Sequence, residues 1–283
     1  MPGSMFPRLP VVKNLFIRRI RVGPGNNNLI LREHVMINIL IRIAYDGTNY
    51  SGFQFQDNAP TIQEAFEKAL EVVYKQPIRV AGAGRTDSGV HARGQAASYR
   101  APFRIAVENI PHALNALLPP DIVVTSANEV ADDFHARFDA RGKLYSYTLD
   151  LAPFPQVFKR LYSWHLTDPI NVDLIQRAGR LFTGTHDFSA FQAAGSLVSD
   201  TVRTLNRVEA VAVPGEKLLI IYFEGSGFLY RMVRLITGTL VRAGKGTIGT
   251  AEIEAALAGA NPAAAGPTAP PHGLCLEAVY YGE

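Results

Sequence analysis

One short segment, VAGAGRTDSGVHARGQAASY at residues 80–99, places a cation and a carboxylate on a glycine-flanked turn between two apolar runs. Gly82 and Gly84 allow the backbone to approach a ligand closely. Arg85 stands two positions before Asp87, and a nearby guanidinium favours the ionised form of a carboxyl group. An ionised carboxylate is what a carboxylate nucleophile requires. The segment therefore predicts a nucleophilic Asp87 with Arg85 beside it.

Other interpretations of this segment fit less well. In a dinucleotide-binding turn the third glycine would stand where Asp87 is, and a helix rather than the predicted strand would follow. The segment lacks the Gly-Lys-Ser/Thr of a phosphate-binding loop, and it has too few carboxylates in register for a calcium loop. Asp and Gly are also ordinary turn residues, so a purely structural turn is the main alternative.

Composition limits the class of protein. The chain has 283 residues, of which 47 % are hydrophobic and 19 % are charged, so it has room for one large domain or two modest ones. Its apolar runs fall short of the roughly 18 residues that a membrane span needs. Cys275 is the single cysteine, which excludes a disulfide framework and a thiolate zinc site and fits a reducing compartment. We therefore expect a soluble, cytoplasmic protein with no membrane partner.

The positive charge is concentrated at the N-terminus. Residues 1–35 carry six basic residues and one acidic residue, whereas residues 36–283 carry 22 basic and 24 acidic residues. This leader contains Pro, Gly and Asn clusters and ends directly before Met36 and a strand pattern, so we expect it to be disordered and to carry no chemistry. A transit peptide is the alternative, but serine is scarce. A body that binds a polyanion must then gather its arginines locally.

The N-terminal half, residues 36–140, alternates strand and helix patterns. We expect strands at 36–47, 78–84, 90–100 and 121–130, and helices at 62–73 and 106–119. Thr61 and Glu64 form the pattern of a capping box at the start of the first helix. The resulting β-α-β-β-α-β order is that of a ferredoxin-like split βαβ unit.

The C-terminal half, residues 141–283, repeats this rhythm. We expect strands at 143–151, 201–213, 217–225 and 274–281, and helices at 171–184, 228–244 and 250–259, with a Pro/Ala/Gly loop at 261–273. The sequence therefore predicts an α+β protein with two ferredoxin-like or RRM-like lobes and mixed, mainly antiparallel sheets. A cleft between the lobes is the expected site.

The segment GAGRTDSGVHARGQ closely resembles the signature of the TruA family of tRNA pseudouridine synthases, in which Gly-Arg-Thr-Asp-x-Gly-Val-His-Ala surrounds the catalytic aspartate. IAYDGTNYSGFQFQ resembles the opening strand and loop of that family, with Phe55 where Trp is common. DDFHARFDARGKLYSYTL, GTHDFSAF and GSGFLYRMVRLITGTL resemble later family segments in the same order. The resemblance covers about residues 36–283 and implies the pseudouridine synthase fold.

The resemblance also implies an activity and its residues. The family breaks the N-glycosidic bond of a uridine in tRNA, rotates the base and rejoins it through C5, with no metal or redox cofactor. It implies that Asp87 is the nucleophile, attacking either the base or the ribose, that Tyr145 stacks on the uracil and helps to move a proton at C5, and that Arg234 pairs with Asp87. Uridines 38 to 40 of the anticodon arm are the expected targets, and a homodimer is the expected assembly.

Basic residues near these motifs are candidates for contact with RNA. Arg85 is expected to reach into the RNA, since a guanidinium both stacks on bases and binds phosphates. A row of basic side chains along the cleft is expected to bind RNA phosphates and to make RNA binding depend on salt. The candidates for this row are Arg93, Arg137, Arg141 and Lys143. His91 and His135 each begin a His-Ala-Arg triplet, which suggests a loop facing RNA, but a packed, hydrogen-bonded histidine is equally consistent.

Two alternatives to this function remain open from the sequence. The first is a non-catalytic RNA-binding protein with two RRM-like lobes, although no strand shows the aromatic motif of an RRM. In that case Tyr145 would be a core aromatic residue and Arg234 a solvated helix arginine. The second is a synthase with a different target, because motifs around the nucleophile do not identify the uridine that is modified.

Overall fold

The computed structural model describes residues 36–195, 198–259 and 265–282, so the predicted leader at 1–35 lies outside the described residues. The described chain forms one mixed sheet, in which the main path of strands is β4-β1-β3-β10-β5-β9-β8-β7. Two short strands lie off this path, β2 on β3 and β6 on β5. None of the helices in the described ranges is long and apolar enough to cross a membrane.

The N-terminal half contains the predicted elements. They are β1 (Ile37–Tyr45), α1 (Ile62–Tyr74), β2 (Val80–Gly82), β3 (His91–Ala101), α2 (Asn109–Asn115) and β4 (Ile122–Glu129). The Thr61 side chain caps α1 by accepting from the Glu64 amide, as predicted, while the Glu64 carboxylate is engaged by Lys68. α2 is shorter than predicted because no side chain caps its start at Glu108 and two prolines follow its end.

The C-terminal half contains more elements than predicted. They are β5 (Ala140–Asp150), β6 (Trp164–His165), α3 (Val172–Leu181), β7 (Gly184–Asp187), η1 (Ser189–Phe191), β8 (Val202–Ala212), β9 (Leu218–Gly225), α4 (Met232–Gly244), α5 (Thr250–Leu257), η3 (Pro271–Gly273) and β10 (Leu274–Tyr281). The prediction that α4 begins at Phe228 is wrong. Arg231 has a left-handed φ of 57°, which an α-helix does not accommodate, so the helix begins after it.

The two halves share a sheet because the last strand joins them. β10 pairs in parallel with β3, where Cys275 stands opposite His91, and in antiparallel with β5, where Leu276 stands opposite Tyr145. The α+β class and the mixed, mainly antiparallel pairing are as predicted, but the expected separate sheets are one continuous sheet. β5 begins at Ala140, and the division of the chain into two domains near this residue stays a prediction.

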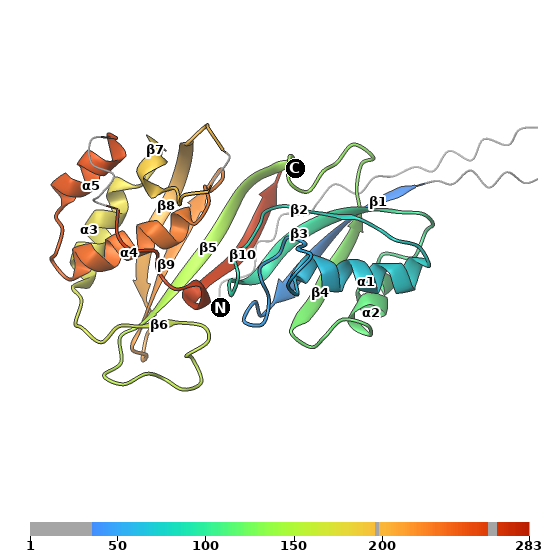
Figure 1. Ribbon diagram of the computed structural model, residues 1–283, viewed down its shortest axis with the longest axis horizontal. Coiled ribbons are helices and arrows are strands. Elements are labelled where there is room, and N and C mark those ends of the chain that lie inside the picture. The colour runs from blue at the N-terminus through green and yellow to red at the C-terminus, as the bar shows by residue number, and fades with distance from the viewer. Residues whose placement is uncertain (1–35, 196–197, 260–264, 283) are drawn as a thin grey trace, which may run out of the picture.

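The helices of both halves lie on one face of this sheet. A row of paired residues crosses that face: Ala92, Leu276, Tyr145, Phe223 and Val208. Gly179 of α3 lies against this row at Val208, while on β3 the Tyr99 ring contacts Tyr74 of α1. Neighbouring residues on a strand point to opposite faces, so Ser146 and Cys275 lie on the other side. Figure 1 shows the two helical groups at either end, with β5 and β10 between them.

The core fills the space between this face and the helices. Phe66 of α1, Phe182 after α3, Tyr147 of β5 and Phe223 of β9 are all fully buried. Full burial of one such side chain contributes about 1.5–3 kcal/mol to folding. The middle of the sheet is therefore a rigid platform for the residues that β5 carries.

Candidate active site

Asp87 and Arg234 form an ion pair between the two halves of the chain. Asp87 stands on the loop between β2 and β3, and its Oδ2 accepts a hydrogen bond from Nη1 of Arg234 at 2.8 Å. Arg234 is in the first turn of α4, and its side chain is 10 % exposed against 19 % for Asp87. Oδ1 of Asp87 accepts no hydrogen bond from the residues that the structure describes. That oxygen is available to a substrate.

The loop before β10 holds Arg234 in position. Nε of Arg234 donates to the carbonyl of Ala269 at 2.8 Å, and the amide of Ala269 donates back to the Arg234 carbonyl at 3.1 Å. A Cβ at Gly238 would lie 1.8 Å from the Pro267 oxygen, so the loop packs directly on the helix backbone. Two nitrogens of the guanidinium are thus fixed by hydrogen bonds, Nε on Ala269 and Nη1 on Asp87.

Tyr145 lies beside this ion pair on β5. Its side chain is 7 % exposed, and its ring contacts Phe228 edge-on with the centroids 5.1 Å apart. Burial raises the pKa of the Tyr145 phenol well above its usual 10, and the nearby Tyr45 and the charge of Asp87 raise it further. The phenol therefore stays neutral at physiological pH. The three predicted residues of the site come together from three separate segments.

Buried polar contacts hold the Asp87 loop from below. The Tyr45 hydroxyl of β1 and Oγ1 of Thr86 are 2.8 Å apart. Gln95 of β3 is fully buried, and its Nε2 donates to the Gly84 carbonyl at 2.9 Å and to the Tyr45 hydroxyl at 3.4 Å. Sequence reasoning did not identify Tyr45, Thr86 or Gln95. An amide side chain directly before the apolar pair Ala96-Ala97 in β3 was the available signal.

A second loop supports Asp87 from the side. Gly52 has a φ of +91°, and a Cβ there would lie 2.4 Å from the Thr86 carbonyl oxygen. The same oxygen accepts from the Phe53 amide at 3.2 Å, and the Gly89 amide donates to the Tyr50 carbonyl at 3.2 Å. Gly52 and Phe53 of the opening motif therefore make a close backbone contact with the Asp87 loop, and a side chain at position 52 would prevent it.

We expect Thr86→Val to lower the turnover rate about tenfold while tRNA affinity changes little. Valine keeps the shape of threonine, but it leaves the Tyr45 hydroxyl without this buried partner and loosens the loop by about 1–2 kcal/mol. Thr86→Ser restores the hydroxyl and should recover most of the rate. Steady-state kinetics on tRNA measure both. Equal rates for the valine and serine variants would show that this hydrogen bond does not position Asp87.

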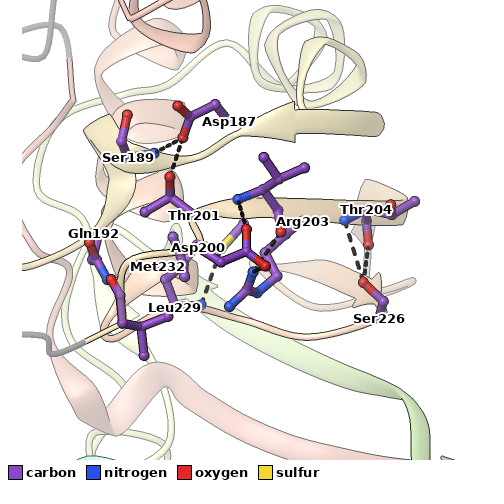
Figure 2. A network of polar contacts seen from close by, with 12 residues as sticks. Asp187, Ser189, Gln192, Asp200, Thr201, Arg203, Thr204, Ser226, Leu229 and Met232 are labelled. Atoms are coloured by element: carbon purple, nitrogen blue, oxygen red, sulfur yellow. Dashed lines mark hydrogen bonds and ion pairs between the residues drawn. The ribbon is translucent and has the colours of Figure 1, made fainter.

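Another polar network, shown in Figure 2, lies next to the approach to α4. Asp187 of β7 accepts from the Ser189 amide and from the Thr201 hydroxyl, at 2.9 and 2.6 Å. These bonds lower the pKa of the Asp187 carboxyl below its usual value. Across β8, the Ser226 amide donates to the Thr204 carbonyl at 3.0 Å. The network ties the GTHDFSAF loop and the segment before α4 to the same sheet edge.

Four of the predicted RNA-binding residues are exposed: Arg85, Arg93, Arg137 and Arg141. Arg85 extends from the Asp87 loop, and its Nε donates to Oε1 of Gln54 at 3.0 Å. Arg137 and Arg141 are also exposed, with the Arg137 guanidinium over the ring of Phe138. Lys143 is half-buried on β5, two positions before Tyr145 and hence on the same face of the sheet. Contact of these residues with RNA stays a prediction.

Two further candidates lie away from Asp87. Arg93 pairs with Glu277 at 2.7 Å, and Glu277 accepts from the hydroxyl of Ser146, which faces the side of the sheet opposite to Tyr145. His91 is 6 % exposed, and its Nδ1 accepts from the Gly47 amide at 3.1 Å. The packed, hydrogen-bonded interpretation of His91 therefore fits its surroundings, and direct contact with RNA stays a prediction.

A cavity of about 320 Å³ lies on that opposite face, and Asp87 does not line it. Its walls include His91, Arg93, Ser146 and Cys275, which share the side of the sheet without helices. Within the described ranges, no group of three or more His, Cys, Asp or Glu residues is arranged to hold a metal ion. The residues that the sequence predicts for the chemistry, Asp87 and Arg234, therefore do not line this cavity.

This chain is similar to known proteins over most of its length. The family described as tRNA pseudouridine synthase matches residues 41–139 and 178–282. A protein of Thermoanaerobacter sp. (strain X514) named tRNA pseudouridine synthase A is 43 % identical over 87 % of this chain and 100 % of its own length. A protein of the same name from Moorella thermoacetica is 46 % identical over 85 % of this chain and 98 % of its own.

A third relative of that name, from Shouchella clausii, is 44 % identical over 88 % of this chain and 95 % of its own. Among solved structures, a chain of a Cbf5-Nop10-Gar1 complex aligns with a TM-score of 0.32 and 10 % identity, covering 71 % of this chain and 54 % of that one. This similarity is too low to inform the site. The sequence relatives and the matched family show that this chain belongs to the tRNA pseudouridine synthases, which are isomerases.

Proposed function

We propose that this enzyme isomerises uridines 38, 39 and 40 in the anticodon stem-loop of tRNA and that Asp87 is its nucleophile. The main support is the ion pair at 2.8 Å between Asp87 and Arg234, which leaves Oδ1 of Asp87 without a partner in the described chain. Further support is the neutral phenol of Tyr145 next to it. The target positions rest on the resemblance to the TruA family and on relatives named tRNA pseudouridine synthase A.

The reaction rearranges bonds without adding or removing atoms. The bond between C1′ of the ribose and N1 of uracil breaks, the base rotates, and a bond forms between C1′ and C5. The C5 proton is lost and N1 becomes protonated. The uridine must first leave the helical stack, which costs a few kcal/mol. Asp87 forms a covalent bond either to the base ring or to the ribose and is released unchanged.

Each residue of the site has a separate task in this proposal. Arg234 holds the Asp87 carboxylate in one orientation through a direct, charge-assisted hydrogen bond. The Tyr145 ring provides a flat surface for the extruded uracil, and its neutral hydroxyl takes part in the proton transfer at C5. Arg85, exposed beside the nucleophile, takes the place that the flipped base leaves or holds its phosphate.

Release of tritium from tRNA containing [5-³H]uridine tests the activity, because the C5–H bond must break for pseudouridine to form. The expected result is release in proportion to the uridine converted. Mapping pseudouridine in tRNA from a strain that lacks the gene should show losses at positions 38 to 40 alone. Absence of release with intact tRNA binding would favour the non-catalytic RNA-binding alternative. Losses at other positions would mean that the enzyme has a different target.

We also propose a cytoplasmic homodimer as the working form. The resemblance to the TruA family supports the dimer, and so do large apolar side chains exposed on the loop between β5 and β6, Phe154, Val157 and Phe158. The single cysteine supports a reducing compartment. Light scattering of the purified chain should give twice the monomer mass, and a monomer at micromolar concentration would contradict the dimer.

A further inference from the structure

Lys143 is a half-buried cation that has no counter-ion among the described residues. It makes no hydrogen bond or ion pair with any residue in the part of the chain that the structure describes. A Cβ at Gly84 would lie 2.7 Å from its Nζ, so the ammonium rests directly on the backbone of the Asp87 loop. A half-buried charge is costly unless it is paired. An anion that the described chain does not supply would offset this cost.

The acidic groups on the surrounding elements are turned away or engaged elsewhere. On β9, Glu224 pairs with Leu144 and so faces the other side of the sheet from Lys143. On β10, Glu277 accepts from Ser146 and pairs with Arg93.

On the neighbouring loops, the acidic groups are also engaged and other groups are positive. Asp87 is bound to Arg234, and Asp139 accepts from the His135 amide at 2.7 Å. Arg85 and Arg137 add positive charge, and Arg137 interacts electrostatically with Lys143. The surroundings of Lys143 thus favour an external anion.

We propose that Lys143 binds a backbone phosphate of the RNA next to the uridine that enters the site. This inference rests on the proposed function, since it takes Tyr145 as the surface that holds the base. Residues two apart on a strand are about 6.6 Å apart and face the same way. A nucleotide with its base on Tyr145 can therefore bring its flanking phosphate to Lys143, and the absence of a side chain at Gly84 leaves room for the ammonium.

The contact makes binding of tRNA depend on pH. Burial, followed by the repulsion of Arg137, lowers the pKa of Lys143 to about 8. A bound phosphate favours the charged form and raises that pKa again. Lys143 therefore takes up a proton on binding above pH 8, so affinity falls as the pH rises from 7 to 9. Below pH 7 the ammonium is already charged, and this contribution is constant.

Two variants at this position test the proposal by equilibrium binding of tRNA to the full-length enzyme. Lys143→Met keeps the length of the side chain without the charge, and we expect about tenfold weaker binding at pH 7. Its dependence of log affinity on log salt should be shallower than that of the wild type by about 0.7–0.9, the value for one phosphate. Lys143→Arg keeps its charge at every pH in this range and should bind with little loss between pH 7 and 9.

The wild type should lose affinity for tRNA relative to Lys143→Arg as the pH rises. Any change in the affinity of Lys143→Met with pH measures the contribution of groups other than Lys143, including those of the tRNA. Lys68→Gln, which removes a cation on α1 that is paired with Glu64, is the control for net charge and should keep the wild-type salt slope. Thermal unfolding confirms that each variant is folded. A Lys143→Met enzyme with the wild-type salt slope and pH dependence would overturn the proposal. Because binding is measured without turnover, that result is separate from a failure of the isomerase assay.

Discussion

We expect Asp87→Asn to lower pseudouridine formation by at least about 10⁴-fold, because an amide oxygen cannot serve as the nucleophile. Asparagine has the same shape as aspartate, and its oxygen can still accept from Nη1 of Arg234. The fold and the affinity for tRNA should therefore be nearly unchanged, with the free energy of unfolding altered by about 1 kcal/mol or less. Tritium release under single-turnover conditions, with tRNA binding measured in parallel, checks both parts.

A remote carboxylate provides the control for this experiment. Asp173 is exposed in the first turn of α3, away from the ion pair, and Asp173→Asn should keep the wild-type rate. Substantial turnover by the Asp87→Asn enzyme would exclude Asp87 as nucleophile. Loss of turnover together with loss of folding would instead assign Asp87 a structural role.

Arg234→Gln should lower the turnover rate by about 10²- to 10³-fold, since the charge that orients the nucleophile is lost. It should also cost about 1–3 kcal/mol of stability, because the partly buried Asp87 carboxylate and the Ala269 carbonyl both lose a donor. Arg234→Lys should restore only part of the rate, because one ammonium cannot reproduce the geometry of Nε and Nη1 toward two acceptors. Chemical denaturation and single-turnover kinetics measure the two effects.

The double variant of Asp87→Asn and Arg234→Gln separates these roles. If Arg234 acts through Asp87, the double variant should be no slower than Asp87→Asn alone, because the nucleophile is already absent. Arg242→Gln, on the same helix, should behave like the wild type. Additive losses in the double variant would show that Arg234 acts on the substrate independently of Asp87.

The sequence was sufficient for most of the helices and strands, because these depend on local signals, and for naming three residues that the structure brings together. The periodicity of 62–73 and the cap at Thr61 predicted α1. The spacing within GRTDSG and the resemblance to the TruA family predicted Asp87, Tyr145 and Arg234, which the structure brings together.

What the sequence did not predict depends on contacts between distant segments. The pairing of β10 with both β3 and β5 merges the lobes into one sheet, and no local pattern encodes that neighbour. α4 starts after Arg231 because Arg231 has a left-handed backbone conformation, which the helical periodicity of residues 228–244 does not reveal. The hydrogen bonds of the Tyr45 hydroxyl with Thr86 and with Gln95 join segments that are more than 40 positions apart in the chain. The burial of His91 depends on the segment around Leu161, which covers it only in the folded chain.

A structure of the Asp87→Asn enzyme with bound tRNA would test the central claim most directly. The measurement is the distance from the side-chain oxygen at position 87 to the nearest carbon of the target uridine, its C1′ or a ring carbon. We expect an extruded uridine with its base against Tyr145 and that distance at about 3–3.5 Å, the separation of groups ready to react. A uridine still paired in its stem, or RNA bound across the opposite face of the sheet at Arg93, would contradict the assignment.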